Sequence, residues 1–156
     1  MATSVFVNLP AADLARSRQF FTALGFSIDE KFSNEDAICV VISDTIYAML
    51  LKPDFFATFT KRPVGDATSA TEVIVALATD DREGVDRLVE TALANGGSAS
   101  NETQDTGWMY SRSFQDPDNH LWEVVWMDPE AAEQGPPADQ VAVDRAAGSD
   151  PLEAAP

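Results

Sequence analysis

Apolar residues recur along the first 127 positions in two spacings, and the spacings follow one another in the same order twice. Short apolar runs predict strands, whereas apolar residues repeating at i, i+3, i+4 and i+7 predict a helix. The first half predicts a strand over 4–9, a helix over 12–24 that Gly25 ends, and strands over 26–32, 37–42 and 45–51. The second half predicts a strand over 72–78, a helix over 81–95 that Gly96 ends, and strands over 98–103, 108–114 and 120–126.

The two halves therefore repeat one unit of strand, helix, strand, strand, strand. A four-stranded sheet covered by one helix leaves its other face open. We predict an α+β fold in which two βαβββ modules form a curved mixed sheet around a shared cleft, a common place for a ligand. Module one spans about 4–52, a linker with a short helix about 53–70, and module two about 71–127.

Residues 129–156 have a different composition, rich in Ala, Pro, Asp and Glu and without an aromatic residue. Such a segment cannot bury enough apolar surface to offset the entropy of ordering. We expect residues 1–128 to form the domain and residues 129–156 to form a disordered acidic tail.

The formal net charge of the chain is -16. A field of this sign repels nucleic acid and anionic membrane surfaces, so neither is expected as a partner. The sequence begins without a signal-like segment and contains no apolar run long enough to span a bilayer. We expect an acidic cytoplasmic protein.

The single cysteine, Cys39, lies in the apolar run 37–42. One cysteine allows neither a disulfide within the chain nor a zinc site built on several thiolates. We expect Cys39 to be a buried structural thiol.

The stretch FQDPDNHLWEVVW, from Phe114 to Trp126, predicts a hairpin, because Asp-Pro-Asp-Asn favours a turn. A symmetric loop of even length centred on Pro117 and Asp118 would place Arg112 opposite Glu123 on one face. His120 is three residues from Glu123, and residues three apart on a strand point to opposite faces. We therefore expect His120 to be an exposed turn residue that shares no ion with Glu123.

On this register, the face with Glu123 would line the cleft, while Trp122 and Trp126 would pack beneath the helices. Arg112 would offset the cost of placing the carboxylate in a half-apolar cavity. An ordinary cross-strand ion pair would explain the same spacing. The other residues expected to line the cleft are Asn8, Tyr47, Met49, Trp108 and Tyr110.

The opening VNLPAADLARSRQFFTALGF and the hairpin FQDPDNHLWEVVW resemble the vicinal oxygen chelate superfamily. This superfamily includes glyoxalase I, bleomycin-resistance proteins, fosfomycin-resistance enzymes and extradiol dioxygenases. SDTIYAMLL, TEVIVALATDDREGVDRLVETALANGG and WEVVWMDP are similar to bacterial proteins labelled predicted lactoylglutathione lyases. The resemblance covers residues 4–129 and implies a small-molecule cleft and, by analogy, a homodimer.

The resemblance also implies where a metal would bind in metal-using relatives. Their ligand in the last strand corresponds to Glu123, whereas their first-strand ligand corresponds to Phe6, beside Asn8. A further ligand corresponds to Glu72 or Ile74. We expect no complete catalytic metal site, with Glu72 and Glu123 as remnants of one, since such sites need about three protein ligands.

Three functions remain open at this point. In the first, a metal-independent cleft binds a small molecule, with Glu123 and Arg112 as the catalytic candidates. In the second, a divalent metal such as Zn, Ni, Mn or Fe supports a glyoxalase-type lyase, isomerase or dioxygenase. In the third, the protein sequesters a drug or metabolite without chemistry. The sequence does not decide whether the chain is an enzyme.

Overall fold

The computed structural model describes residues 3–138. The first module contains β1 (Val5–Pro10), α1 (Leu14–Ala23), β2 (Ser27–Ile28), the 3-10 helix η1 (Glu30–Phe32), β3 (Ala37–Val41) and β4 (Ile46–Leu51). A linker that begins with α2 (Pro53–Ala57) leads to the second module. That module contains β5 (Ile74–Ala78), α3 (Arg82–Ala94), β6 (Ser98–Ala99), β7 (Gln104–Asp105), β8 (Met109–Gln115) and β9 (Leu121–Met127), and α4 (Pro129–Gln134) follows it.

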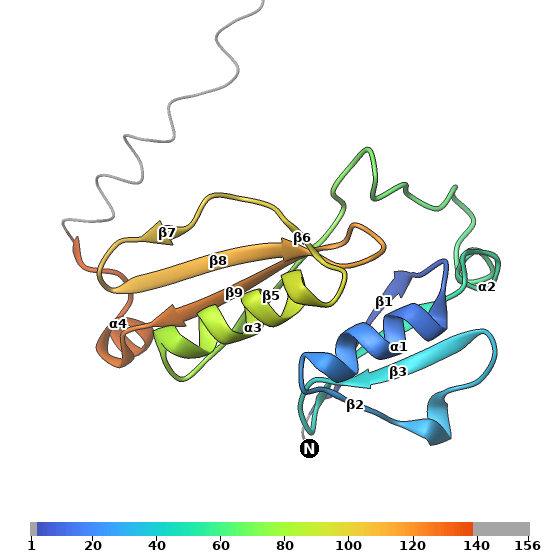
Figure 1. The fold of residues 1–156 in the computed structure, drawn as a ribbon, viewed down its shortest axis with the longest axis horizontal. Coiled ribbons are helices and arrows are strands. Elements are labelled where there is room, and N and C mark those ends of the chain that lie inside the picture. The colour runs from blue at the N-terminus through green and yellow to red at the C-terminus, as the bar shows by residue number, and fades with distance from the viewer. Residues whose placement is uncertain (1–2, 139–156) are drawn as a thin grey trace, which may run out of the picture.

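The predicted α+β fold of two βαβββ modules is confirmed, and each module has its own mixed sheet. The strand order is β1-β4-β3-β2 in the first sheet and β5-β9-β8-β6 in the second, where β7 also pairs with β8. In each sheet the first and last strands of the module run parallel, and the other pairs are antiparallel. The two modules lie side by side, and the linker runs between them (Figure 1).

The two helices α1 and α3 each begin at an aspartate cap and end just before a glycine. The Asp13 side chain accepts a hydrogen bond from the Arg16 amide at the start of α1, and Asp81 does the same for Gly84 in α3. Gly25 and Gly96 follow the helices with φ of 96° and 107°, a conformation that glycine adopts without steric cost. The predicted helix ends are therefore confirmed to within two residues.

Two predicted strands are shorter than expected. In place of a strand over 26–32, β2 ends at Ile28, because the Asp29 side chain accepts from the Lys31 amide and caps η1. In place of a strand over 98–103, only Ser98–Ala99 pairs with β8. Loop residue Asn101 instead donates its backbone N–H to the Ser113 hydroxyl, at 2.8 Å.

A single hydrophobic core joins the two modules through their helix-covered faces. Phe20 of α1 lies 5.9 Å from Phe114 of β8, and Phe21 lies 5.3 Å from Trp122 of β9, measured between ring centroids. Trp122 is fully buried, as predicted for a residue beneath the helices. Because the modules meet on this side, the opposite face of each sheet takes no part in this contact.

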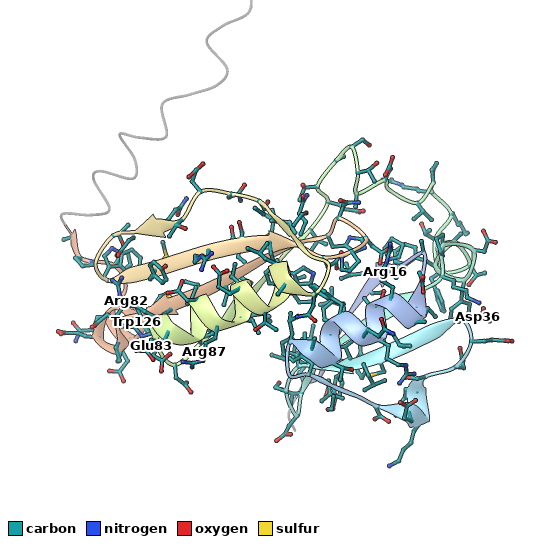
Figure 2. The ribbon with its side chains drawn as sticks, in the orientation of Figure 1. Arg16, Asp36, Arg82, Glu83, Arg87 and Trp126 are labelled. Atoms are coloured by element: carbon teal, nitrogen blue, oxygen red, sulfur yellow. The ribbon has the colours of Figure 1, made fainter. Side chains whose placement is uncertain are left out.

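The turn between β8 and β9 fastens the second module to the first, and we call Asp118 and His120 the module clasp. The Asp118 carboxylate accepts hydrogen bonds from the Ala12 amide at 2.9 Å, the Arg16 guanidinium at 3.1 Å and the Ser17 hydroxyl at 3.3 Å. Arg16 belongs to α1, and its guanidinium pairs with Asp118 in this turn (Figure 2). A negative charge near the start of a helix is also favourable to the helix dipole.

His120 is the other half of the module clasp, and the prediction that it is exposed is wrong. Its side chain lies 2.6 Å, through Nε2, from the Pro10 carbonyl oxygen, and the residue is buried. The neighbouring Asp116 accepts hydrogen bonds from the His120 amide and the Trp122 indole N–H. Burial raises the pKa of Asp116 above its usual value even though these hydrogen bonds oppose the shift. The Asp-Pro-Asp-Asn-His motif therefore holds the two modules together.

The predicted tail starts with a helix, which corrects the expectation of disorder from residue 129. The Asp128 side chain accepts hydrogen bonds from the Glu130 and Ala131 amides, and Pro129 occupies the first turn, where proline is well tolerated. Gly135 ends this helix with a φ of 89°. Residues 139–156 lie outside the described residues, so the boundary of the domain stays a prediction.

None of the helices in residues 3–138 has the length and apolar character needed to cross a bilayer. The cytoplasmic location stays a prediction.

Candidate functional site

The β8–β9 hairpin has a different register from the one predicted. Gln115 is opposite Leu121, so five residues lie between the paired ends, and Ser113 rather than Arg112 is opposite Glu123. The odd loop length comes from Asn119, which has a φ of 68° and closes the turn by donating its N–H to the Asp116 carbonyl. A shift of one residue moves a side chain to the other face of the sheet. Arg112 and Glu123 therefore point to opposite faces, and the predicted pairing is wrong.

Arg112 lies on the helix-covered face and is bound to α3. Its guanidinium donates to Asp86 at 2.8 Å and to Glu90 at 2.7 Å. Burial acts to lower the pKa of Arg112, but these two contacts outweigh it and raise the pKa overall. Because both ends of the guanidinium fork are occupied by carboxylates of the same chain, Arg112 is a structural ion-pairing residue.

Tyr110 is on the same covered face as Arg112, and its hydroxyl donates to Asp86 at 2.9 Å. The pKa of Tyr110 is raised mainly by burial and to a smaller extent by this hydrogen bond. Trp108 precedes β8, and its carbonyl accepts from the Asp128 amide at 2.7 Å. The prediction that Tyr110 lies on the cleft-facing side is therefore wrong, for the same reason of register.

Arg82, at the start of α3, belongs to this covered side as well. Its guanidinium lies about 5 Å from the ring centroids of Tyr110 and Trp126 and forms two hydrogen bonds to Asp105. Arg82 and Trp126 lie together at the end of the second module (Figure 2). The contact with Arg82 lowers the pKa of Asp105 to about 2.

The exposed face of the first module, which we call open face one, carries Phe6, Asn8, Tyr47 and Met49. Phe6 is paired with Tyr47 across β1 and β4, and their rings stack with centroids 4.7 Å apart. Asn8 is paired with Met49, and Tyr47 donates its hydroxyl to the Asp44 carbonyl. Phe6 is 51 % exposed, so this stack offers an aromatic surface to a partner or ligand.

The exposed face of the second module, open face two, carries Glu123. Its neighbours on this face are Ala76, Ser113, Leu121 and Val125. Glu123 is partly buried, and no hydrogen bond or ion pair joins its carboxylate to another residue within 3–138. An acceptor of this kind among apolar neighbours is available to a donor group of a ligand.

The residues present do not fit a catalytic metal. At the position where metal-using relatives place a first-strand ligand, Phe6 stacks on Tyr47. The described part of the chain contains no group of three His, Cys, Asp or Glu side chains able to hold an ion. A catalytic zinc-type site uses about three protein ligands, and the described residues bring no such set together.

Glu72, the second candidate remnant, lines a cavity that does not include Glu123. It precedes β5 in the linker, and together with Asn8 it lines a cavity of about 590 Å³. This cavity lies between β1, the linker and the β8–β9 turn, and Glu123 is not among its lining residues. The two carboxylates therefore do not form one site.

The resemblance to known proteins is strong for the fold and partial for the sequence. Residues 3–43 match the family model of the bleomycin resistance protein-like N-terminal domain. A hypothetical protein of S. aureus is 27 % identical, with a TM-score of 0.68 over 81 % of this chain and 94 % of that one. A curated protein that matches this sequence is not found.

Two further solved structures share the architecture at 18 % identity. A glyoxalase/bleomycin resistance protein/dioxygenase family enzyme from Burkholderia phytofirmans PsJN has a TM-score of 0.67, covering 81 % of this chain and 99 % of that one. A bleomycin resistance determinant encoded on the transposon Tn5 has a TM-score of 0.56, covering 81 % and 98 %. This chain therefore shares the fold of proteins named for glyoxalase and bleomycin resistance, the fold that the resemblance to the vicinal oxygen chelate superfamily predicted. A particular kinship with lactoylglutathione lyases stays a prediction.

Two features of the site were missed by reasoning from the sequence. Ser113 is on the face of Glu123, which follows only once the loop is known to contain an odd number of residues. The αL preference of Asn119 was the available signal, because an αL residue after a type I turn is typical of an odd loop. The cavity at the linker was also missed, since the linker has no periodic pattern that would place it.

Proposed function

We propose that this chain binds a small molecule in a cleft that the open faces of two copies form together. The observation that carries the proposal is the unpaired Glu123 carboxylate on a largely apolar sheet face. A second copy is needed because the modules of one chain meet through Phe20, Phe21, Phe114 and Trp122, on the side away from both open faces.

The exposure of apolar side chains supports the pairing of two copies. On the two open faces, Phe6 is 51 %, Ile74 50 % and Met127 39 % exposed. Large apolar side chains exposed on a sheet face are a feature of interaction sites. If open face one of one copy covers open face two of another, the stacked Phe6 and Tyr47 rings and Glu123 line one cleft.

The chemistry of this cleft favours binding over metal-assisted catalysis. The Phe6–Tyr47 stack supplies aromatic area, and Glu123 supplies an acceptor or a negative charge. Arg112 is occupied by Asp86 and Glu90, so an anion-holding role for it receives no support. The ligand we expect is therefore a planar or apolar molecule with a hydrogen-bond donor or a positive charge.

The proposal is tested by a thermal-shift screen of the full chain against a small-molecule library that includes bleomycin. Bleomycin is a reasonable probe because one structural neighbour is a bleomycin resistance determinant. A hit should raise the melting temperature and be recovered chemically unchanged after long incubation. For any hit, Phe6→Ala and Glu123→Gln should weaken binding, by about five-fold or more for the aromatic contact.

Arg112→Lys is the matched control, because Arg112 lies on the covered face of the same hairpin. It should leave the affinity for the hit unchanged while lowering the melting temperature of the free protein. If hits bind Phe6→Ala and Glu123→Gln as tightly as the natural chain, the open faces are not the site. Turnover of the methylglyoxal-glutathione hemithioacetal that depends on an added divalent metal would contradict the proposal.

A further inference from the structure

The cavity at the linker has a lining of definite chemistry. It measures about 590 Å³, within the range of sites that hold drug-sized ligands. Its walls are mostly apolar and come from β1, from Phe56 of α2, and from linker residues such as Val64 and Ala70. Asn8 and Leu121, one from each open face, line it, whereas Phe6, Tyr47 and Glu123 do not. The cavity therefore adjoins the proposed cleft but includes neither its aromatic stack nor its Glu123 carboxylate.

The charged side chains at the cavity are both acids. Asp66 and Glu72 line it, and its lining includes neither lysine nor arginine. Hydrogen bonds from Thr68 lower the pKa of Asp66 and keep this carboxyl ionised at neutral pH. The Glu72 carboxylate lies against Gly65, because a Cβ at Gly65 would come within 3.2 Å of Glu72 Oε2. The negative charge is therefore held at the rim of the cavity.

The backbone of β1 adds a further acceptor. The Val5 and Ala11 amides bond to the β4 side of the sheet, whereas the Pro10 carbonyl points away from β4 to His120. Since backbone groups alternate sides along a strand, the carbonyl of Asn8 points with that of Pro10 toward the free edge of β1. Asn8 also lines the cavity, so its carbonyl is available there.

The His120 side chain, the remaining titratable group in the lining, is already committed to the Pro10 carbonyl at 2.6 Å. The cavity thus presents apolar walls, two carboxylates and a backbone acceptor, with no cation in its lining to balance them. A small molecule with an apolar body and a positively charged nitrogen satisfies these groups best. We propose that the linker cavity binds a cationic amphiphile, with the ammonium group at Asp66 and Glu72 and the apolar body against Phe56 and β1.

Three probes with alkyl chains of equal length test the proposal, namely octylamine, 1-octanol and octanoate. Each probe is titrated into the full-length protein, and binding is followed by amide NMR. Octylamine should shift the amide signals of Gly65 and Ala70 and bind about ten-fold more tightly than octanoate, since two carboxylates attract one and repel the other. The affinity for 1-octanol should lie between those for octylamine and octanoate. Equal binding of octylamine and octanoate, or shifts confined to open face one and open face two, would overturn the proposal.

Variants separate the cavity from general attraction to an acidic protein. Glu72→Gln should weaken octylamine about three-fold and leave octanol unchanged, as expected for one exposed charge. The matched control is Glu102→Gln, which removes the same charge from a loop residue that does not line the cavity. An equal loss in both variants would show non-specific attraction and overturn the proposal.

Two more variants distinguish binding in the linker cavity from binding in the proposed cleft. Ala70 is exposed at the cavity wall, so Ala70→Phe should fill the space without disturbing the core and should weaken octylamine and octanol alike. Unchanged binding to that variant would rule out the cavity. Phe6→Ala, which removes the aromatic stack of the cleft, should leave the octylamine shifts at Gly65 as they are. A loss there would assign the probe to the cleft instead.

Discussion

Removal of the Asp118 carboxylate should destabilise the chain more than its position in a turn suggests. Asp118 is two residues before His120, and its side chain is 11 % exposed while accepting hydrogen bonds from Ala12, Arg16 and Ser17. In Asp118→Ala these three donors lose one acceptor that joins module two to module one. The perturbation therefore tests whether the turn motif holds the modules together.

The size of the effect follows from the exposure of each donor. The bond from the Ala12 amide resembles a helix cap and is worth about 1 kcal/mol. Arg16 is 47 % exposed, so its ion pair adds about 0.5 kcal/mol after screening by solvent. Ser17 keeps its second partner, the Asp13 carbonyl, and adds little. We expect a loss of about 1.5 kcal/mol for Asp118→Ala and roughly half of that for Asp118→Asn, which retains an acceptor.

Urea unfolding followed by tryptophan fluorescence measures this loss, because Trp122 lies in the core that both modules share. The transition midpoint should fall while the slope of the free energy against urea stays the same. Glu102→Ala serves as the control, since it removes an acid from an exposed loop and should change stability by less than about 0.5 kcal/mol. If Asp118→Ala behaved like this control, the module clasp would have no energetic role and the reasoning would be refuted.

Three further predictions concern side chains whose environment the structure defines. Arg112→Ala should lower the unfolding free energy by about 1 to 2 kcal/mol, because it removes the ion pairs to Asp86 and Glu90. Glu123→Gln should stay within about 0.5 kcal/mol of the natural chain. Equal losses of the two variants in urea titrations would contradict the register of the β8–β9 hairpin. Asp105 has a folded pKa of about 2, below its unfolded value, so its stabilising contribution is present at neutral pH and is lost as pH falls from about 4 towards 2. Asp105→Asn should flatten this part of the curve of unfolding free energy against pH. An unchanged curve would disprove the contact with Arg82. Cys39 is buried, and its pKa is raised mainly by burial and to a smaller extent by the Asp29 charge. An aromatic disulfide reagent should therefore label it slowly in the native chain and rapidly in urea. Equal labelling rates would contradict its burial.

The elements of the fold could be predicted because each depends on local chemistry. The helix caps Asp13 and Asp81, the stops Gly25 and Gly96, and the two hydrophobic periodicities lie within short windows of the sequence. The repetition of these signals then implied two modules. The parallel pairing of the first and last strands within each module is seen only in the structure, because no local signal records it.

The site was harder to predict because it depends on one residue of register and on contacts between distant segments. The face that carries Glu123, Leu121 and Val125 was assigned to the side away from the helices, which agrees with the structure. An even loop length predicts Arg112 on the same face, and the odd length in the structure moves it to the other one. The burial of His120 depends on Pro10, 110 positions away, and no local pattern records such a contact.

The solution mass of the full chain tests the central claim, that two open faces from different copies complete the cleft. Light scattering should give twice the chain mass of 16.8 kDa for the natural protein. Ile74→Arg, a substitution at a half-exposed position on open face two, should reduce the mass to that of one chain while the fold is retained. A mass of one chain for the natural protein at every concentration, with Ile74→Arg indistinguishable from it, would contradict the account.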